Sequence, residues 1–109
     1  PPALARMFDV HLFQAIARAS AATSGAYRPG DRHAMLIFVR QDRGTEHNWA
    51  GAEDGAREAG WFEISINRAG TLSAENLNGK GEGFMGAFEH AMNGGCGLIV
   101  YADPVAEDV

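Results

Sequence analysis

Two stretches of the sequence repeat one pattern, AGAEDGAREAGWFEISI at residues 50–66 and MGAFEHAMNGGCGLIVY at residues 85–101. A shift of 35 positions aligns two small residues, a glycine and an isoleucine in the two copies. The matched pairs are Ala52 with Ala87, Ala56 with Ala91, Gly60 with Gly95, and Ile64 with Ile99. Small residues four apart favour a packed helix, glycine ends it, and the apolar residues that follow favour a strand. The repeat therefore predicts two helix-strand units of a βαβ-type domain.

The segments around the repeat extend this prediction. Residues 34–39 form a continuous apolar run, which is typical of a strand buried on both faces of a sheet. We expect helices over about 46–59, with Thr45 as the N-cap, and over about 82–93. Strands are expected at 61–67, where apolar and polar residues alternate, and at 98–101.

The N-terminal 22 residues are predicted to form a helix. Their apolar side chains follow the three-and-four spacing of one helical face, at Leu4, Met7, Phe8, Leu12, Ala15, Ile16 and Ala19. Val10 and Phe13 lie off this stripe, so a second face is apolar as well. A helix that is apolar on two sides often lies between two layers or two subunits. We therefore expect a homodimer through this helix or a sheet edge.

The predicted interface of that dimer combines helix residues with one tryptophan. Leu4, Phe8, Val10 and Phe13 would form the helical part. Trp49, at the start of the next helix, would mark a partner surface if its ring is exposed. Packing within one core remains the alternative for all five residues.

The fold class depends on residues 68–77. Arg68-Ala69-Gly70 is predicted to be a turn, and residues 71–77 to be either a short strand or one turn of helix. A strand would give βαββαβ, an α+β two-layer sandwich of the ferredoxin-like type, which the repeat favours. A helical turn would leave a three-stranded parallel α/β sheet. Both alternatives begin with the N-terminal helix.

The length of 109 residues indicates a single domain. Within it we expect an N-terminal helix over 1–22, an α/β body over 34–103 and a tail over 104–109. Cys96, the only cysteine, cannot form an intramolecular disulfide, and the sequence has no apolar stretch of membrane-spanning length. A cytoplasmic protein without membrane contact is the expectation.

The distribution of charge along the sequence indicates which classes of partner the protein could bind. The net charge is −5, which argues against nucleic acid as the main partner. Residues up to Arg43 carry six arginines and three aspartates, whereas the remainder has three basic and eleven acidic residues. The basic N-terminal part could pack on the acidic part, within one chain or across a dimer, or could bind an acidic protein partner.

The glycine-rich stretch from Asn78 to Gly83 is the sharpest candidate for ligand binding. It places Gly79, Lys80, Gly81 and Gly83 at a helix N-terminus, where backbone N–H groups could hold a phosphate or carboxylate. A flexible connector is the competing interpretation. Arg40 and Asp103 follow two apolar strands and would share one rim only in a parallel sheet. A small-anion-binding enzyme or sensor is therefore the alternative function.

The sequence offers no motif for catalysis or metal binding. Four histidines occur, but none has the spacing of a metal motif, and no cysteine pair accompanies them. Cys96 lies between two glycines and is expected to be a small buried residue rather than a nucleophile. We therefore expect no catalytic residues, no metal and no cofactor. A non-catalytic binding or regulatory role is the preferred function.

Overall fold

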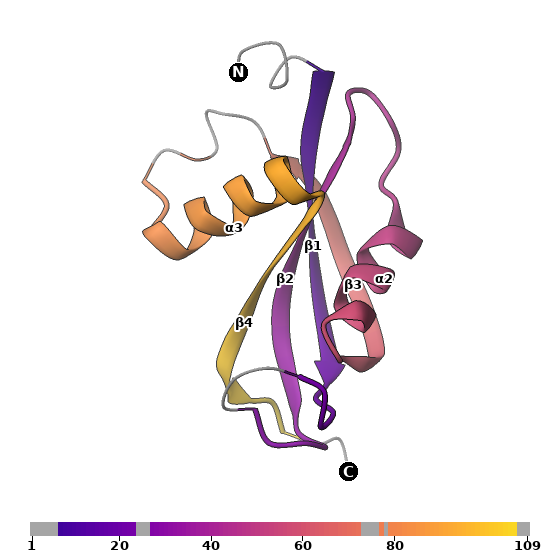
Figure 1. The fold of residues 1–109 in the computed structure, drawn as a ribbon, viewed down its shortest axis with the longest axis vertical. Coiled ribbons are helices and arrows are strands. Elements are labelled where there is room, and N and C mark those ends of the chain that lie inside the picture. The colour runs from indigo at the N-terminus through magenta and orange to yellow at the C-terminus, as the bar shows by residue number, and fades with distance from the viewer. Residues whose placement is uncertain (1–6, 24–26, 73–76, 78, 107–109) are drawn as a thin grey trace.

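The chain folds around a four-stranded sheet in which every neighbouring pair of strands is antiparallel (Figure 1). The computed structural model describes residues 7–23, 27–72, 77 and 79–106. In chain order the elements are β1 (Phe8–Arg18), β2 (Arg32–Asp42), α2 (Trp49–Glu58), β3 (Phe62–Leu72), α3 (Glu82–Gly94) and β4 (Cys96–Pro104). The order across the sheet is β3-β1-β2-β4, so β1 and β2 are central and β3 and β4 lie at the edges.

The two helices pack on opposite faces of this sheet (Figure 1). On one face, Ala52 and Ala56 of α2 pack against alternate residues of β1 and β2, such as Phe13 and Ile37. On the other face, α3 contacts the residues that point the opposite way, which form a second, smaller core. The members of that core are Val10, Phe38, Ala87 and Ala91. The arrangement is one small α+β unit with a helix on each side of the sheet.

The predicted N-terminal helix is wrong within the described residues, because residues 8–18 form the central strand β1. Phe13 and Ala15 are buried in the core with α2, His11 is buried against His47 in the loop before α2, and Val10 is buried in the core with α3. A strand that is covered on both faces has apolar residues on both, so it lacks the alternation of apolar and polar residues that normally identifies a strand. The apolar residues outside the helical stripe, Val10 and Phe13, therefore indicated a strand that is buried on both faces. Leu4 lies outside the described residues.

The ferredoxin-like sandwich and the three-stranded parallel sheet are both wrong. β3 continues to Leu72 through the turn predicted at 68–70, because these residues pair with β1. Arg68 lies opposite Gln14, and Gly70 lies opposite Leu12. The sheet is antiparallel throughout, and its helices lie on two faces instead of one. Residues 73–76, part of the undecided stretch, lie outside the described residues.

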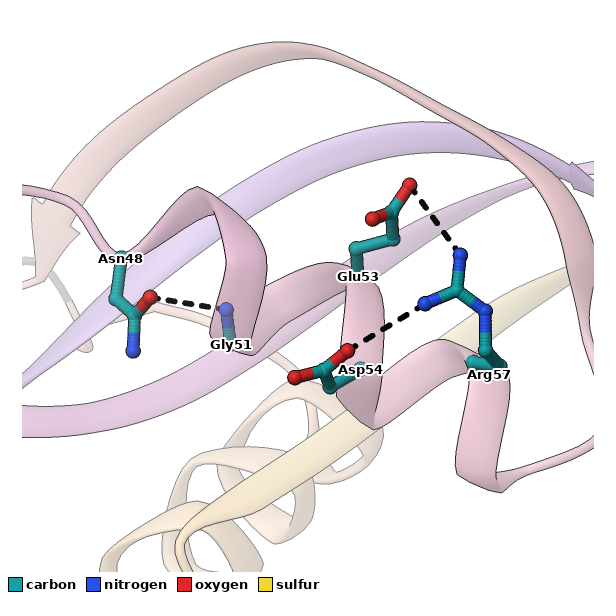
Figure 2. A network of polar contacts seen from close by, with 5 residues as sticks. All are labelled: Asn48, Gly51, Glu53, Asp54 and Arg57. Atoms are coloured by element: carbon teal, nitrogen blue, oxygen red, sulfur yellow. Dashed lines mark hydrogen bonds and ion pairs between the residues drawn. The ribbon is translucent and has the colours of Figure 1, made fainter.

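The two repeated helices are confirmed, although the first begins later than predicted. Asn48, not Thr45, caps α2, with its side-chain oxygen accepting a hydrogen bond from the Gly51 N–H at 2.9 Å (Figure 2). The Thr45 hydroxyl instead donates to the Asp42 carbonyl. On the outer side of α2, Arg57 pairs with Glu53 and Asp54 (Figure 2). Gly95 ends α3 in the left-handed conformation, as the repeat predicted.

α3 lies across the strands instead of along them (Figure 1). It packs directly on β4 at Gly97, where an added Cβ would be 2.5 Å from the Ala87 carbonyl oxygen. A strand of 11 residues is about 36 Å long, whereas a helix is about 10 Å wide. A single transverse helix therefore covers only part of its face.

Candidate functional site

The strand-end residues Arg40 and Asp103 do not share a rim. Arg40 lies near the end of β2, beside the start of β4, where its backbone N–H donates to the Gly95 carbonyl. Asp103 lies near the other end of β4. The Arg40 guanidinium donates to the Met92 carbonyl at 2.7 Å and lies 4.7 Å from the centre of the Phe8 ring. Arg40 thus ties the C-terminal end of α3 to the sheet.

The glycine-rich loop leads into α3, as predicted, and Gly79, Lys80 and Gly81 are exposed. The Lys80 ammonium lies 5.4 Å from the centre of the Phe84 ring, and Glu82 occupies the first turn of the helix. A carboxylate at that place opposes a bound anion. Asn78 lies outside the described residues. Anion binding by this loop stays a prediction.

The residues of the predicted interface do not form one surface in the structure. Val10 and Phe13 are buried on opposite faces of β1, in the two separate cores. Phe8 is half-buried beneath Arg40. Trp49 is 48% exposed at the start of α2, with its ring edge against Phe13. Of these residues, Trp49 presents the largest surface to a partner.

A cleft of about 660 Å³ runs along the β4 edge between the two helices. Its walls include five glycines, namely Gly55, Gly83, Gly86, Gly94 and Gly97, together with Glu58, His90 and Cys96. Burial, and secondarily the negative charge of Glu58, raises the pKa of the Cys96 thiol. The thiol is therefore protonated at neutral pH, which disfavours nucleophilic chemistry in this cleft.

A pair of histidines connects β1 to the loop before α2. Nδ1 of His11 lies 2.7 Å from Nδ1 of His47, so one ring nitrogen donates and the other accepts. Burial, and then the charge of His47, lowers the pKa of His11, whereas Asp9 acts in the opposite direction. Among the described residues, no group of three or more His, Cys, Asp or Glu side chains is placed to hold a metal ion.

The face of the sheet that carries α3 is covered at one end and open at the other. Along β1, the residues that face α2 are buried from His11 to Ala19, whereas on the opposite side Val10 is buried and Gln14 is exposed. A depression of about 360 Å³ lies over β3, β1 and β2. It is lined by Leu12, Gln14, Leu36, Arg68, Ala69 and Gly70.

The strand register defines the residues of this open region, which we name the open half-face. Two rows of residues cross the sheet from β3 to β4, and a third row runs from β3 to β2. Tyr101 is placed in the second row by the alternation of side chains, because its neighbour Val100 packs in the core below α2. The rows are Arg68, Gln14, Leu36 and Ile99; then Ser65, Ile16, Ala34 and Tyr101; then Phe62, Arg18 and Arg32. The central strands contribute Gln14, Ile16, Ala34 and Leu36 to the open half-face, and Leu36 also packs against the core under α3.

Exposed aromatic rings and arginines border the open half-face. Phe62 is 43% exposed at the β3 edge, and Tyr101 is 48% exposed at the β4 edge. All charged residues in the three rows are arginines, Arg18, Arg32 and Arg68. Glu63 reaches this border from β3, where its carboxylate pairs with the Arg18 guanidinium at 2.7 Å. The open half-face therefore combines aliphatic, aromatic and arginine side chains.

The open half-face was missed in the sequence because the segment that forms its centre was predicted to be a helix. Leu12, Gln14, Ile16 and Arg18 are separated by two positions and lie in one line only if the chain is extended. The alternation Leu-Gln-Ile-Arg was the available signal. Pairing of this line with β2 and β3 is a long-range property, which local spacing does not contain.

Comparisons with known proteins return no relatives: no protein-family model, no curated protein and no solved structure matches the chain. Within the described part of the chain, no helix is long and apolar enough to cross a membrane.

Proposed function

We propose that this protein is a non-catalytic binding domain that docks a protein partner on the open half-face. The observation that carries the proposal is the contrast along β1, whose α2 side is buried up to Ala19 while Gln14, on the other side, is exposed. Sheet faces of small domains are normally covered by another layer, and apolar surface without such a cover marks interaction sites. We place this function in the cytoplasm, because the sole cysteine leaves no intramolecular disulfide to form.

Two classes of protein partner fit this proposal, a second copy of the chain and a different protein. Both would bury Ile16 and the accessible parts of Leu36 and Ile99, which also pack against the core under α3. Exposed rings such as Tyr101 supply large contact area at interfaces. The proposal replaces the predicted dimer through an N-terminal helix, since that helix is a strand in the sheet.

Site-specific photo-crosslinking tests the proposed function. A benzophenone amino acid replaces Gln14, which is exposed in the middle of the open half-face, and in a control protein it replaces Asp54 on the outer side of α2. We expect a discrete protein adduct from position 14 in cells that make the protein, and none from position 54. The mass of the adduct separates a second copy from another protein. Equal labelling from both positions, or no adduct at position 14, would contradict the proposal.

A further inference from the structure

The outer edge of β4 is a second surface that is built to pair with another chain. We infer that two copies of the protein pair through this edge, β4 against β4 in antiparallel orientation. Each copy would insert the end of its β4 between the two helices of the other. The inference goes beyond the proposed function, because it concerns the edge of the sheet instead of the open half-face.

The backbone of β4 presents a row of hydrogen-bonding groups at this edge. Gly95 and Val105 flank the strand, and the backbone of each bonds to β2. Successive residues of a strand direct their N–H and C=O groups to opposite sides. The groups of Cys96, Leu98 and Val100 therefore point away from β2, where, among the described residues, no further strand pairs with them. Only the backbone of another extended chain matches such a row.

β4 lacks the features that prevent pairing at a sheet edge. Charged side chains, proline and bulges protect edge strands. β3 carries Glu63 and Arg68, and its register with β1 shifts twice. β4 has no charged residue and no proline from position 96 to position 102, and its register shift with β2 lies between Val100 and Pro104. Of the two edges, β4 is therefore the one suited to a second strand.

The cleft of about 660 Å³ provides the space for that strand. It is lined by both helices, which lie on opposite faces of the sheet, and, among the described strands, by β4 alone. A space bounded by helices of both faces lies beyond the sheet edge, and Figure 1 shows the N-terminal end of α3 extending past β4 on its outer side. Gly55, Gly83 and Gly86 in its walls leave room for an added backbone.

The two ends of β4 differ, which favours two identical strands in antiparallel orientation. Both helices flank the beginning of β4, from Cys96 to Leu98, whereas Tyr101 and Asp103 near its other end are exposed. A two-fold axis places the exposed end of each strand beside the flanked beginning of the other. Parallel pairing would instead bring helices against helices. Each copy therefore supplies the strand end that fits the cleft of the other.

The diameter of α3 selects one register for this pairing. α3 contacts β4 at Gly97, and in the joined sheet both copies of α3 would lie on the same face. If Gly97 lies opposite Tyr101 of the second copy, the two contact points are about 14 Å apart, more than the helix diameter of about 10 Å. Opposite Ile99 they would be about 7 Å apart, and the helices would collide. Opposite Asp103, the ladder would have to include Pro104, which has no N–H.

A strand of a different protein is the competing occupant, because backbone groups alone carry no sequence information. The net charge of −5 repels two copies at a distance. The segment that would pair, residues 96–102, is however uncharged, so no like charges are brought together in the ladder. The match between the exposed end of β4 and the cleft at its beginning favours the second copy.

A disulfide between copies tests the register. In the selected register Cys96 lies opposite residue 102 of the second copy, so Ala102→Cys should give a covalent dimer on oxidation. Within one extended strand these positions are about 20 Å apart, so the bond can form only between chains. Mass spectrometry of a digest identifies the linkage. Ser65→Cys, an exposed position on β3, is the control and should give no discrete dimer.

A charge at each edge tests the contact without a covalent bond. Tyr101→Lys would bring an ammonium group into the cleft of the second copy, and we expect it to raise the dimer dissociation constant about tenfold or more in sedimentation equilibrium. Phe62→Lys, at the edge of β3, should leave the constant unchanged. Both rings are exposed, Tyr101 by 48% and Phe62 by 43%, so the two variants are matched.

The outcomes decide the inference separately from the proposed function. A monomer at every concentration, a dimer that Tyr101→Lys leaves intact, or a disulfide that forms as readily with Ser65→Cys would overturn the pairing of β4 edges. Capture of a different protein by a benzophenone amino acid at position 102 of a monomeric chain would overturn it as well. If the chain is monomeric while the crosslinker at position 14 yields a protein adduct, the inference fails and the proposed function stands. A dimer through β4 without any adduct at position 14 gives the reverse result.

Discussion

At the scale of single residues, the contact between His11 and His47 connects ionisation to folding. His11 is 2% exposed, and its short contact requires one protonated and one unprotonated ring nitrogen. Burial is the main cause of its lowered pKa, followed by His47, and Asp9 opposes both. Asp9 is itself paired with Arg43. Arg43 and His47 both belong to the loop between β2 and α2. The fold therefore favours neutral His11.

This arrangement predicts that acidification destabilises the protein. A histidine whose pKa is lower in the folded state takes up its proton preferentially on unfolding. The stability due to neutral His11 is therefore complete above its unfolded pKa of 6.5 and is lost as the pH falls from there toward the lowered folded value. Urea unfolding between pH 8 and pH 5 should show a slope that His11→Phe reduces by at most about 1.4 kcal/mol per pH unit.

The control for this prediction is His90→Gln, which replaces an exposed histidine on α3. It should leave the slope close to that of the unmodified protein. An unchanged slope in His11→Phe would show that this histidine does not contribute to the pH dependence. The comparison of slopes also remains valid if His11→Phe alters stability at every pH.

At the scale of elements, the close approach of α3 to β4 depends on one glycine. An added Cβ at Gly97 would meet the Ala87 carbonyl oxygen at 2.5 Å, and this oxygen belongs to the helix backbone. Gly86, one residue before Ala87, has no atom within 4 Å of an added Cβ and is exposed. Replacing glycine by alanine should therefore have opposite effects on stability at positions 97 and 86.

We expect Gly97→Ala to lower the free energy of unfolding by about 1–3 kcal/mol, because the helix must move away from the sheet. Gly86→Ala should raise it by about 1 kcal/mol, because alanine favours the helix and meets no obstacle. Chemical denaturation of the two variants provides the measurement. A stabilising Gly97→Ala would mean that α3 is not held against β4 as described.

The elements also show which parts of the fold the sequence could predict. The ends of α2 and α3 were predictable because Gly60 and Gly95 adopt positive φ angles, a local steric requirement. β1 was not, since residues such as Leu12 and Ala15 fit both a helical stripe and a strand buried on both faces. Arg68-Ala69-Gly70 has turn-forming residues, but pairing with β1 overrides that preference. The open half-face required both strands and was therefore beyond local patterns.

At the scale of the whole molecule, the uneven charge along the sequence becomes an uneven charge in space. The basic N-terminal part supplies both central strands, and Arg18 and Arg32 of these strands lie on the open half-face. The acidic remainder supplies both helices, which carry Glu53, Asp54 and Glu89 among other carboxylates. The arginines of the two central strands and the carboxylates of the two helices therefore belong to different layers of the molecule.

The sheet order also predicts where the molecule opens first. β1 and β2 pair over eleven residues each and have a further strand on the outer side, whereas β3 and β4 have, among the described residues, a partner strand on one side only. Amide hydrogen exchange should therefore be slowest in β1 and β2 and faster at the edges, because an edge strand can separate without global unfolding. Exchange measured at two protein concentrations distinguishes intrinsic protection from pairing between copies. Protection of β4 equal to that of β2 at both concentrations would contradict the prediction, whereas protection of β4 that rises with concentration would indicate that copies pair through this edge.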